Sequence, residues 1–429
     1  MPLNIVLVNP PIYDFSAYDF WLKPYGLLQV AGYLRGQASL ALFDYLDRCH
    51  PLAPSLPVQH TGTWERGPFY AEDVPKPPVF AKIPRTYRRY GLPRALFQAF
   101  LAAAEPFDVA LIQTVMTYWY PGVREVIEDI RARAPQTRIV LGGVYATLCP
   151  QHARSLGADL VVDHASLEPL WQLLQCSPRL QELPLWESYD DLRVGVLKLA
   201  DGCPFTCTYC SVPQVYPPFI ARPLERSLAE LAWLRQCGAQ QVAFYDDALL
   251  FKPAQILLPF LREVLRRGLE GPFHTPNALN ARFITPDIAN LMVQAGFQTF
   301  YLGFESSAYT WQRHTGGKVY AHELERAVEA LVRAGADIRQ ITAYLIMAHP
   351  QTEQQDVEAS MHFAHALGLR LMLSEFSPIP GTPDGERCRA WVDLDEPLWH
   401  NKTVFPLLFL GAAEVQRLKA LCRALNSQL

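Results

Sequence analysis

The chain has 429 residues, half of them apolar, and a formal net charge of −4. Its length exceeds what one hydrophobic core normally supports, so we expect more than one domain, and its apolar content excludes a largely disordered chain. The small negative charge, without a basic run, gives no support for extended nucleic-acid binding or for binding to an anionic membrane surface.

Cysteine usage and the chain start indicate a compartment. There are nine cysteines, an odd number of which only three cluster, so the sequence predicts a reducing cytoplasm rather than a disulfide framework. The first residues lack the basic start and cleavage site of a signal peptide. No apolar run of about 18 residues predicts a membrane span.

The first third of the chain alternates strand and helix patterns. Strands are predicted at residues 5–8, 40–45, 109–113, 138–143 and 160–162, with helices near 26–34 and 123–133. This order predicts an α/β domain over residues 1–168 with an open, doubly wound, Rossmann-like sheet. Ligands of such sheets bind at the carboxyl ends of the strands, so we expect a binding edge there.

Residues 50–94 interrupt this domain with a proline-rich insertion. A loop of this length inside a compact domain is usually functional or disordered. Its aromatic and basic residues favour an ordered cover over the domain junction, where substrate would enter. A packing arm without contact to substrate is the alternative. Residues 169–191 are then expected to form a helical linker.

Three cysteines, Cys203, Cys207 and Cys210, lie within eight residues, directly after the apolar run 194–200. Thiolates this close on a loop after a strand favour zinc or iron–sulfur iron. Structural zinc normally takes two separated ligand pairs, and no second pair with that spacing follows. Three thiolates on a cubane cluster leave one iron open, so the loop is interpreted as catalytic. A zinc site or three unrelated thiols is the alternative.

From residue 192 to 383 the chain again alternates strands with helices. Six strands, near 194–200, 241–245, 273–277, 299–305, 340–346 and 370–376, each end in polar or turn residues. Six units are fewer than a closed eightfold barrel needs, so we expect a partial (β/α)6, TIM-like barrel with its chemistry at that rim. A C-terminal extension, 384–429, contains a helix near 413–425 and is expected to close the open side of the barrel.

The CxxxCxxC spacing, with Tyr209 before the last cysteine, resembles the signature of the radical S-adenosylmethionine (SAM) enzymes. The resemblance implies that Cys203, Cys207 and Cys210 ligate three irons of a 4Fe-4S cluster, and that SAM chelates the fourth iron. The reduced cluster would cleave SAM to a 5′-deoxyadenosyl radical. An external electron donor such as flavodoxin or ferredoxin is implied as a partner.

The same resemblance implies SAM contacts along the rim. A carboxylate suits the SAM ammonium or the ribose hydroxyls, and a turn contacts adenine. The implied SAM-binding residues are Tyr209, Asp246, Asp247, Glu305, Ser306, Pro380 and Gly381. Helix capping or rim salt bridges are the alternative for the three carboxylates. Residues 348–352 depart from the Gly-x-Pro-Gly pattern common after the fifth strand, so no SAM contact is assigned to them.

His274, with Asn277, Asn280 and Arg282, is expected at the end of the third barrel strand, facing substrate or SAM. A buried, hydrogen-bonded histidine is the equally weighted alternative.

The N-terminal domain resembles the cobalamin-binding domain of one large branch of radical SAM enzymes. The resemblance implies that cobalamin contacts eight residues at the strand ends, namely Pro10, Pro11, Thr114, Met116, Tyr118, Gly142, Gly143 and Tyr145. Two features depart from the pattern. The DxHxxG motif that supplies a cobalt ligand in many cobalamin proteins is absent, and a Gly-Glu-rich turn is replaced by residues 163–168, where His164 is interpreted as a surface-loop residue. A vestigial or repurposed domain is the alternative.

Together these resemblances imply a cobalamin-dependent radical SAM methyltransferase that methylates an unactivated carbon of a small molecule or peptide. One SAM would yield the radical, and methylcobalamin, remade from a second SAM, would deliver the methyl group. Radical cyclisation, rearrangement or oxidoreductase chemistry without methyl transfer is the main alternative, and a non-enzymatic cobalamin or iron–sulfur protein is a third. The catalytic residues and the substrate stay unknown, because substrate-facing residues come from variable loops.

Overall fold

The computed structural model describes residues 2–52, 56, 62–163 and 166–429, which divide into two compact units. Unit 1 is the chain up to Gly195 together with two short stretches, Gln236–Ala239 and Asp395–Leu398. Unit 2 is formed by the stretches Val196–Arg235, Gln240–Leu394 and Trp399–Leu429. Each unit has its own parallel sheet.

Unit 1 is built on a five-stranded parallel sheet. Its strands lie in the order β3 (Ala38–Asp44), β1 (Leu3–Asn9), β6 (Val109–Thr114), β7 (Arg138–Gly143) and β8 (Leu160–Val162). The central strand β1 is an apolar run because both of its faces are covered, and residues 5–8 have no exposed surface. The predicted doubly wound sheet is confirmed.

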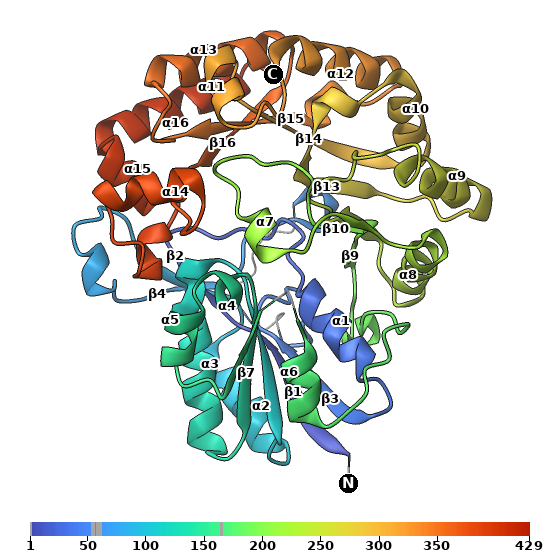
Figure 1. Cartoon of the computed structure of the whole chain (residues 1–429), viewed down its shortest axis with the longest axis vertical. Helices are drawn as coiled ribbons and strands as arrows, with labels where there is room; N and C mark the ends of the chain where they lie inside the picture. Colours follow the sequence, from blue (N-terminus) through green and yellow to red (C-terminus); the bar gives the residue numbers. More distant parts are fainter. Residues whose placement is uncertain (1, 53–55, 57–61, 164–165) are drawn as a thin grey trace. The chain divides into compact units, whose positions relative to one another are not determined.

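Helices cover both faces of this sheet (Figure 1). Helices α1 (Tyr25–Tyr33) and α6 (Glu168–Leu174) lie on one side, and α2 (Arg94–Ala103), α3 (Tyr120–Arg133) and α5 (Pro150–Ser155) lie on the other. The linker expected to be helical over 169–191 is helical only in α6 and in one short turn, Trp186–Ser188. Helix α6 ends at Gln175 in the left-handed conformation, and the prolines at 178 and 184 disfavour further helix.

The described part of the proline-rich insertion is ordered. Strand β5 (Arg88–Tyr90) pairs antiparallel with β2 (Ile12–Asp14) on one side and with β4 (Ala71–Asp73) on the other, so the insertion completes a small three-stranded sheet. Arg89 of β5 donates two hydrogen bonds to Glu125 of α3, at 2.7 and 2.9 Å, and both side chains are 3% exposed. This buried, bidentate pair anchors the insertion on the helix layer of unit 1.

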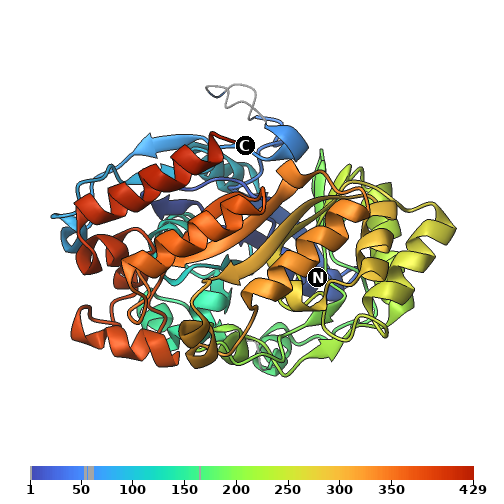
Figure 2. The ribbon, with the colours of Figure 1, turned by 90° about the horizontal axis from the view of Figure 1, so that it is seen from above.

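Unit 2 is an open six-stranded barrel. Its strands follow one another in chain order: β9 (Val194–Leu197), β12 (Gln241–Phe244), β13 (Phe273–Leu279), β14 (Phe297–Glu305), β15 (Ile341–Met347) and β16 (Arg370–Glu375). Figures 1 and 2 show the intervening helices passing along the outer side of this sheet in the same order, namely α8 (Leu224–Gln236), α9 (Leu257–Arg267), α10 (Pro286–Gln294), α12 (Ala321–Arg333) and α13 (Gln354–Ala366). The predicted partial barrel is confirmed.

The C-terminal helix α16 (Ala412–Asn426) covers the edge strand β16. The Asn426 side chain accepts a hydrogen bond from the Leu371 backbone N–H at 2.8 Å and donates one to the Leu371 carbonyl at 2.9 Å. The amide thereby replaces part of a missing neighbouring strand and blunts the open edge. Among the described residues, no helix combines the length and apolar character that crossing a bilayer requires.

The last two residues of β7, Gly142 and Gly143, supply a paired test of the fold. A methyl group at Gly143, whose φ is +109°, would lie 2.3 Å from the Thr114 carbonyl oxygen, whereas one at Gly142 would meet no atom within 4 Å. We expect Gly143→Ala to destabilise the β6–β7 region by about 2–4 kcal/mol and Gly142→Ala by less than about 1 kcal/mol.

Amide hydrogen exchange of peptides from β6 and β7 measures this local stability in a protein with two units. Equal protection in the two variants would contradict the assigned backbone geometry.

Candidate functional site

The three clustered thiols lie on one loop of unit 2, between the short strand β10 (Ala200–Asp201) and helix α7 (Val212–Val215). Each thiol is half-buried. Burial raises the pKa of all three thiols, that of Cys210 to about 11. Cys207 further raises the pKa of Cys203 and of Cys210, while Lys318 lowers the pKa of each thiol. They are therefore electrostatic neighbours that stay protonated until a metal or another cation binds.

The two kinds of metal centre considered for these thiols need different ligand arrangements. No group of three or more His, Cys, Asp and Glu side chains, among the residues the structure describes, is placed to hold one metal ion. A cubane does not need such a group, because each thiolate binds a different iron. Tetrahedral zinc needs four ligands on one centre. Cys203, Cys207 and Cys210 stay the predicted ligands of three irons of such a cluster.

Beside the cluster loop lies a group of buried charges at the carboxyl ends of β9 and β12. Lys198 pairs with Asp201 at 3.0 Å, and Arg222 donates to the same carboxylate at 2.9 and 3.0 Å. Asp246 and Asp247 follow β12 directly. Burial raises the pKa of Asp246 to about 7 and that of Asp247 to about 6, although Lys198 partly opposes it. Carboxylates therefore exceed cations in this group, which suits a cationic ligand.

The two aspartates differ in what they contact. One Asp246 oxygen accepts the backbone N–H groups of Leu199 and Ala200, at 2.9 and 2.7 Å, so it braces the chain leading into the cluster loop. The other Asp246 oxygen, and one oxygen of Asp247, are buried without a hydrogen-bond partner among the described residues. Buried unpaired carboxylate oxygens are costly, and a ligand N–H would satisfy them. Asp247 is therefore more available than Asp246 to bind a ligand.

A second charged pair lies at the end of β14. The Lys318 ammonium is 2.8 Å from Glu305, with side chains 19% and 9% exposed. Burial lowers the pKa of Lys318, but the Glu305 carboxylate raises it on balance. Gly303 makes room for this amine, because a methyl group there would lie 2.5 Å from Lys318 Nζ. Sequence reasoning missed Lys318, although its place after Gly316 and Gly317 marks a turn.

The other predicted SAM residues are distributed around the same loop. The Tyr209 ring stacks on Trp311 with centroids 5.9 Å apart. The Ser306 hydroxyl accepts the Ala308 N–H at 3.1 Å, so it is already engaged. Pro380 is half-buried and Gly381 is exposed, with the Gly381 N–H donated to Glu386 at 2.7 Å. Their assignments to SAM stay predictions.

His274 is not at the rim. It is the second residue of β13, has no exposed surface, and its ring nitrogens lie 3.0 Å from Gln241 and 3.0 Å from Thr299. The expectation that it lies at the strand end is wrong, because β13 continues to Leu279. The buried, hydrogen-bonded alternative holds. Asn277 does reach the rim, where its amide donates to the Tyr245 carbonyl at 2.9 Å.

In unit 1, the residues predicted to contact cobalamin divide into inner and outer groups. Thr114, Tyr118 and Tyr145 are at most 3% exposed, and the Thr114 hydroxyl donates to the Gly142 carbonyl at 3.0 Å. Pro10 and Pro11 are also buried. Met116 is 43% exposed, Gly143 is exposed, and Gly142 has open space beside it. The outer group leaves backbone open to close approach by a ligand. His164 lies outside the described residues.

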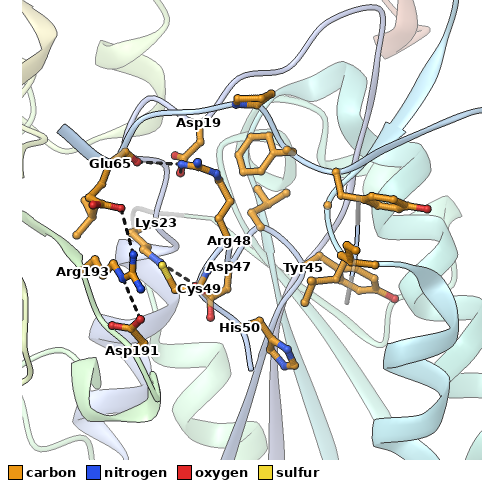
Figure 3. Close-up of a pocket in the computed structure, with 18 of the residues that line it drawn as sticks. Asp19, Lys23, Tyr45, Asp47, Arg48, Cys49, His50, Glu65, Asp191 and Arg193 are labelled. Atoms are coloured by element: carbon orange, nitrogen blue, oxygen red, sulfur yellow. Dashed lines mark hydrogen bonds and ion pairs between the residues drawn. The ribbon is translucent and has the colours of Figure 1, made fainter. Parts of the chain in front are cut away.

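A pocket of about 320 Å³ lies in unit 1 at the carboxyl end of β3 (Figure 3). Its three cations are paired: Lys23 with Asp47 at 3.7 Å, Arg48 with Asp19 at 3.2 Å, and Arg193 with Asp191 at 2.9 Å. The insertion contributes a wall that includes Glu65, Phe69 and Tyr70. None of the eight residues predicted to contact cobalamin is in the lining. The pocket is therefore separate from the predicted cobalamin edge.

Residues 197–364 match the family described as the radical SAM superfamily. The match begins in β9, includes the cluster loop and continues into α13. The chain thus contains a radical SAM domain, as the cysteine spacing predicts. Such a domain implies a 4Fe-4S cluster and SAM as cofactors, and the cysteine and carboxylate groups described above fit them.

Among curated proteins, the chain is 25% identical over 282 residues to a threonylcarbamoyladenosine tRNA methylthiotransferase from Thermotoga maritima, covering 61% of this chain and 64% of that protein. It is 25% identical over 196 residues to an uncharacterized methyltransferase from Pyrococcus horikoshii, covering 45% of this chain and 41% of that protein. The chain therefore spans less than two thirds of the length of these relatives.

Among solved structures, the radical SAM methyltransferase TsrM from Kitasatospora setae, with cobalamin and a 4Fe-4S cluster bound, matches with a TM-score of 0.64 and 14% identity, covering 91% of this chain and 76% of that one. The cobalamin-dependent radical enzyme OxsB, with aqua-cobalamin and SAM bound, matches with a TM-score of 0.57 and 13% identity, covering 99% and 61%. The fold is that of cobalamin-binding radical SAM enzymes.

The raised pKa of Asp247 predicts that the free energy of unfolding depends on pH. An aspartate with a folded-state pKa of about 6, against an ordinary value of 3.8, destabilises the folded state once it ionises. We expect Asp247→Asn to raise the free energy of unfolding of the ligand-free protein at pH 8, by up to about 3 kcal/mol. The gain should fall to about half at pH 5, where folded-state Asp247 is mostly protonated.

Denaturation at both pH values, compared with Asp190→Asn on the exposed surface, measures this effect. A gain that is absent at pH 8, or larger at pH 5 than at pH 8, would contradict the assignment.

Proposed function

We propose that the protein is a radical SAM enzyme that uses cobalamin as a second cofactor to methylate an unactivated carbon of a small molecule or peptide. The observation that carries the proposal is the juxtaposition, in a radical SAM domain, of three neighbouring thiols with a buried group of charges in which carboxylates are in excess. An external reductant, of the flavodoxin or ferredoxin type, would supply the electron.

The residues of unit 2 suit the binding of SAM. When bound, a three-cysteine cluster supplies an open iron and the electron for reductive cleavage of SAM. The unpaired Asp247 oxygen is suited to accept the SAM ammonium, since burial strengthens a charge-assisted hydrogen bond. Lys318 and Glu305, both largely buried, offer a cation for the SAM carboxylate and acceptors for the ribose hydroxyls. Pro380 and Gly381 offer backbone groups for adenine.

Cobalamin is proposed from the fold of unit 1 and from its open edge. Both solved neighbours named above carry cobalamin, and their folds extend over both units of this chain. When bound, cobalamin supplies a methyl group. The open backbone beside Gly142 is where the nucleotide tail would approach, with Met116 on the same exposed edge. Thr114, Tyr118 and Tyr145 would support that edge from within, as buried side chains.

Two other outcomes are distinguishable. Radical chemistry without methyl transfer would form 5′-deoxyadenosine without methyl uptake. Methylthio transfer is the activity named for the Thermotoga relative. It would transfer sulfur together with the methyl group, so its product would gain both.

The direct test is anaerobic reconstitution with iron, sulfide and cobalamin, followed by turnover with SAM labelled in its methyl group. Mass spectrometry then separates a product that gains a labelled methyl from one that gains methyl plus sulfur or neither. Absence of both an EPR-active cluster and SAM cleavage would refute the proposal as a whole.

Cys207→Ala tests the cluster assignment. Loss of one thiolate should prevent assembly of a complete cluster and abolish SAM cleavage, while leaving cobalamin bound, because the variant changes only unit 2. Cys176→Ala, which removes a half-buried thiol of unit 1, is the matched control and should cleave SAM normally. Turnover retained by Cys207→Ala would refute the cluster ligands.

Gly142→Val tests the cobalamin edge. A branched side chain would occupy the open space beside the backbone and should weaken cobalamin binding by about tenfold or more, since a loss of about 1.4 kcal/mol is tenfold. Gly142→Ala should weaken it less. The cobalamin retained after gel filtration is read from its visible absorption. Wild-type retention by Gly142→Val, with the cluster intact, would place the cofactor elsewhere.

A further inference from the structure

The loop after β15, where the sequence departs from the glycine-rich pattern, contains a fully buried histidine. Ala348 has a φ of +63°, a conformation that glycine adopts more easily, and His349 follows with no exposed surface. His349 Nδ1 receives the Trp311 indole N–H at 3.2 Å and the Gln351 backbone N–H at 3.2 Å. Both partners are obligate donors, so Nδ1 is unprotonated and the ring hydrogen is on Nε2.

That Nε2–H points to a buried aspartate. His349 Nε2 is 3.0 Å from Asp384 Oδ2, and the two side chains are 0% and 1% exposed. Asp384 belongs to the short helix α14 (Pro383–Arg387), in the part of the chain that follows β16. The tautomer fixed by Trp311 and Gln351 thus makes the imidazole a donor to this carboxylate.

The same carboxylate oxygen holds the cluster loop. The Thr208 hydroxyl donates to Asp384 Oδ2 in a short hydrogen bond, and the Asp384 backbone N–H donates to the Thr208 carbonyl at 3.2 Å. Thr208 lies between Cys207 and Tyr209. Asp384 therefore hydrogen-bonds to Thr208, a residue within the cysteine motif, through both its side chain and its backbone.

The histidine also supports the neighbouring aromatic residue. The Tyr209 ring lies edge-on to His349, with centroids 6.2 Å apart, and stacks on Trp311, the residue that donates to His349. His349 is thus linked to the Cys207 segment in two ways, through Asp384 to Thr208 and through Trp311 to Tyr209.

We propose that His349 and Asp384 are positioning residues for the iron–sulfur cluster, which hold the segment Cys207 to Cys210 in its cluster-binding conformation through Thr208 and Tyr209. This inference rests on the proposed function in that it takes the cluster as given. It assigns a role to the residues that replace the glycine-rich loop. These residues stabilise the loop that carries the cluster cysteines, whereas a glycine-rich loop would approach SAM with its backbone.

The sharpest variant is Thr208→Val, which keeps the side-chain shape and removes only the hydroxyl that donates to Asp384. Thr208→Ser keeps a hydroxyl and is its matched control. We expect Thr208→Val to lose cluster iron to a chelator about three- to tenfold faster than wild type, because a hydrogen bond to a charged group is lost. Thr208→Ser should stay within about twofold of wild type by the same reasoning.

His349→Phe tests the other end of the network, and His274→Phe is its control, because His274 is equally buried in unit 2 and hydrogen-bonds to Gln241 and Thr299. We expect His349→Phe to release iron faster and to change the EPR spectrum of the reduced cluster. His274→Phe should change neither, because its hydrogen bonds to Gln241 and Thr299 do not involve Asp384 or the cysteine loop. Should His349→Phe fail to fold, the Thr208 pair still decides.

A readout on the protein without its cluster separates this inference from the proposed function. The alkylation rate of Cys207 and Cys210 by iodoacetamide, followed by mass spectrometry, should rise about three- to tenfold in Thr208→Val. If wild-type protein assembles no cluster, the proposed function fails, whatever the alkylation rates. If it assembles one and Thr208→Val and His349→Phe match wild type in iron loss, EPR spectrum and alkylation, the positioning role is overturned.

Discussion

Three thiols in one short loop can bind a cluster together only when the loop has a suitable conformation, and in this protein segments distant in sequence contact and support that loop. Thr208 is held by Asp384 on one side, and its backbone N–H bonds to the Thr315 carbonyl at 3.3 Å on another. Gly316 packs against the Cys207 backbone, since a methyl group there would lie 3.2 Å from Cys207 Cα. The rim elements after β14, β15 and β16 therefore all support the loop that follows β9.

The rim of the barrel at the carboxyl ends of its strands also contains several features that lower folding stability. Two non-glycine residues at strand ends, Glu305 and Ala348, have left-handed backbones with φ of +65° and +63°. Such conformations cost about 1 kcal/mol or more each and are typical of functional sites. Asp246 and Asp247 are buried with unpaired oxygens at the same rim. Ligand binding would relieve the carboxylates, so the site is organised for a bound state.

Unit 1 differs from this rim in how its charged side chains are paired and in what it leaves open to a ligand. Its ion pairs are internally satisfied, as Arg89 with Glu125 and the paired cations of the pocket at β3 illustrate. Its distinctive feature is open backbone at the end of β7, where Gly142 has free space beside it and a side chain at Gly143 would clash with Thr114. A large cofactor with a long tail is recognised along such an edge by close approach, rather than by a compact charged pocket.

The sequence by itself determined the order of elements and the cluster motif, because apolar periodicity and the spacing of Cys203, Cys207 and Cys210 are local properties of the chain. It therefore predicted the doubly wound sheet, the six-stranded barrel and the candidate metal ligands. It misplaced His274, since the end of β13 depends on pairing with β14, and it expected a longer helix after residue 168.

The tertiary structure alone decided which side chains meet. Lys318 reaches Glu305, and His349, Asp384 and Thr208 form one network, although they are separated by up to 176 residues. It also divided two adjacent aspartates into a bracing residue and a candidate ligand. The physical reason is that hydrogen bonds and charge pairs depend on distances set by the packing of strands and helices, and no spacing within a single segment encodes those distances.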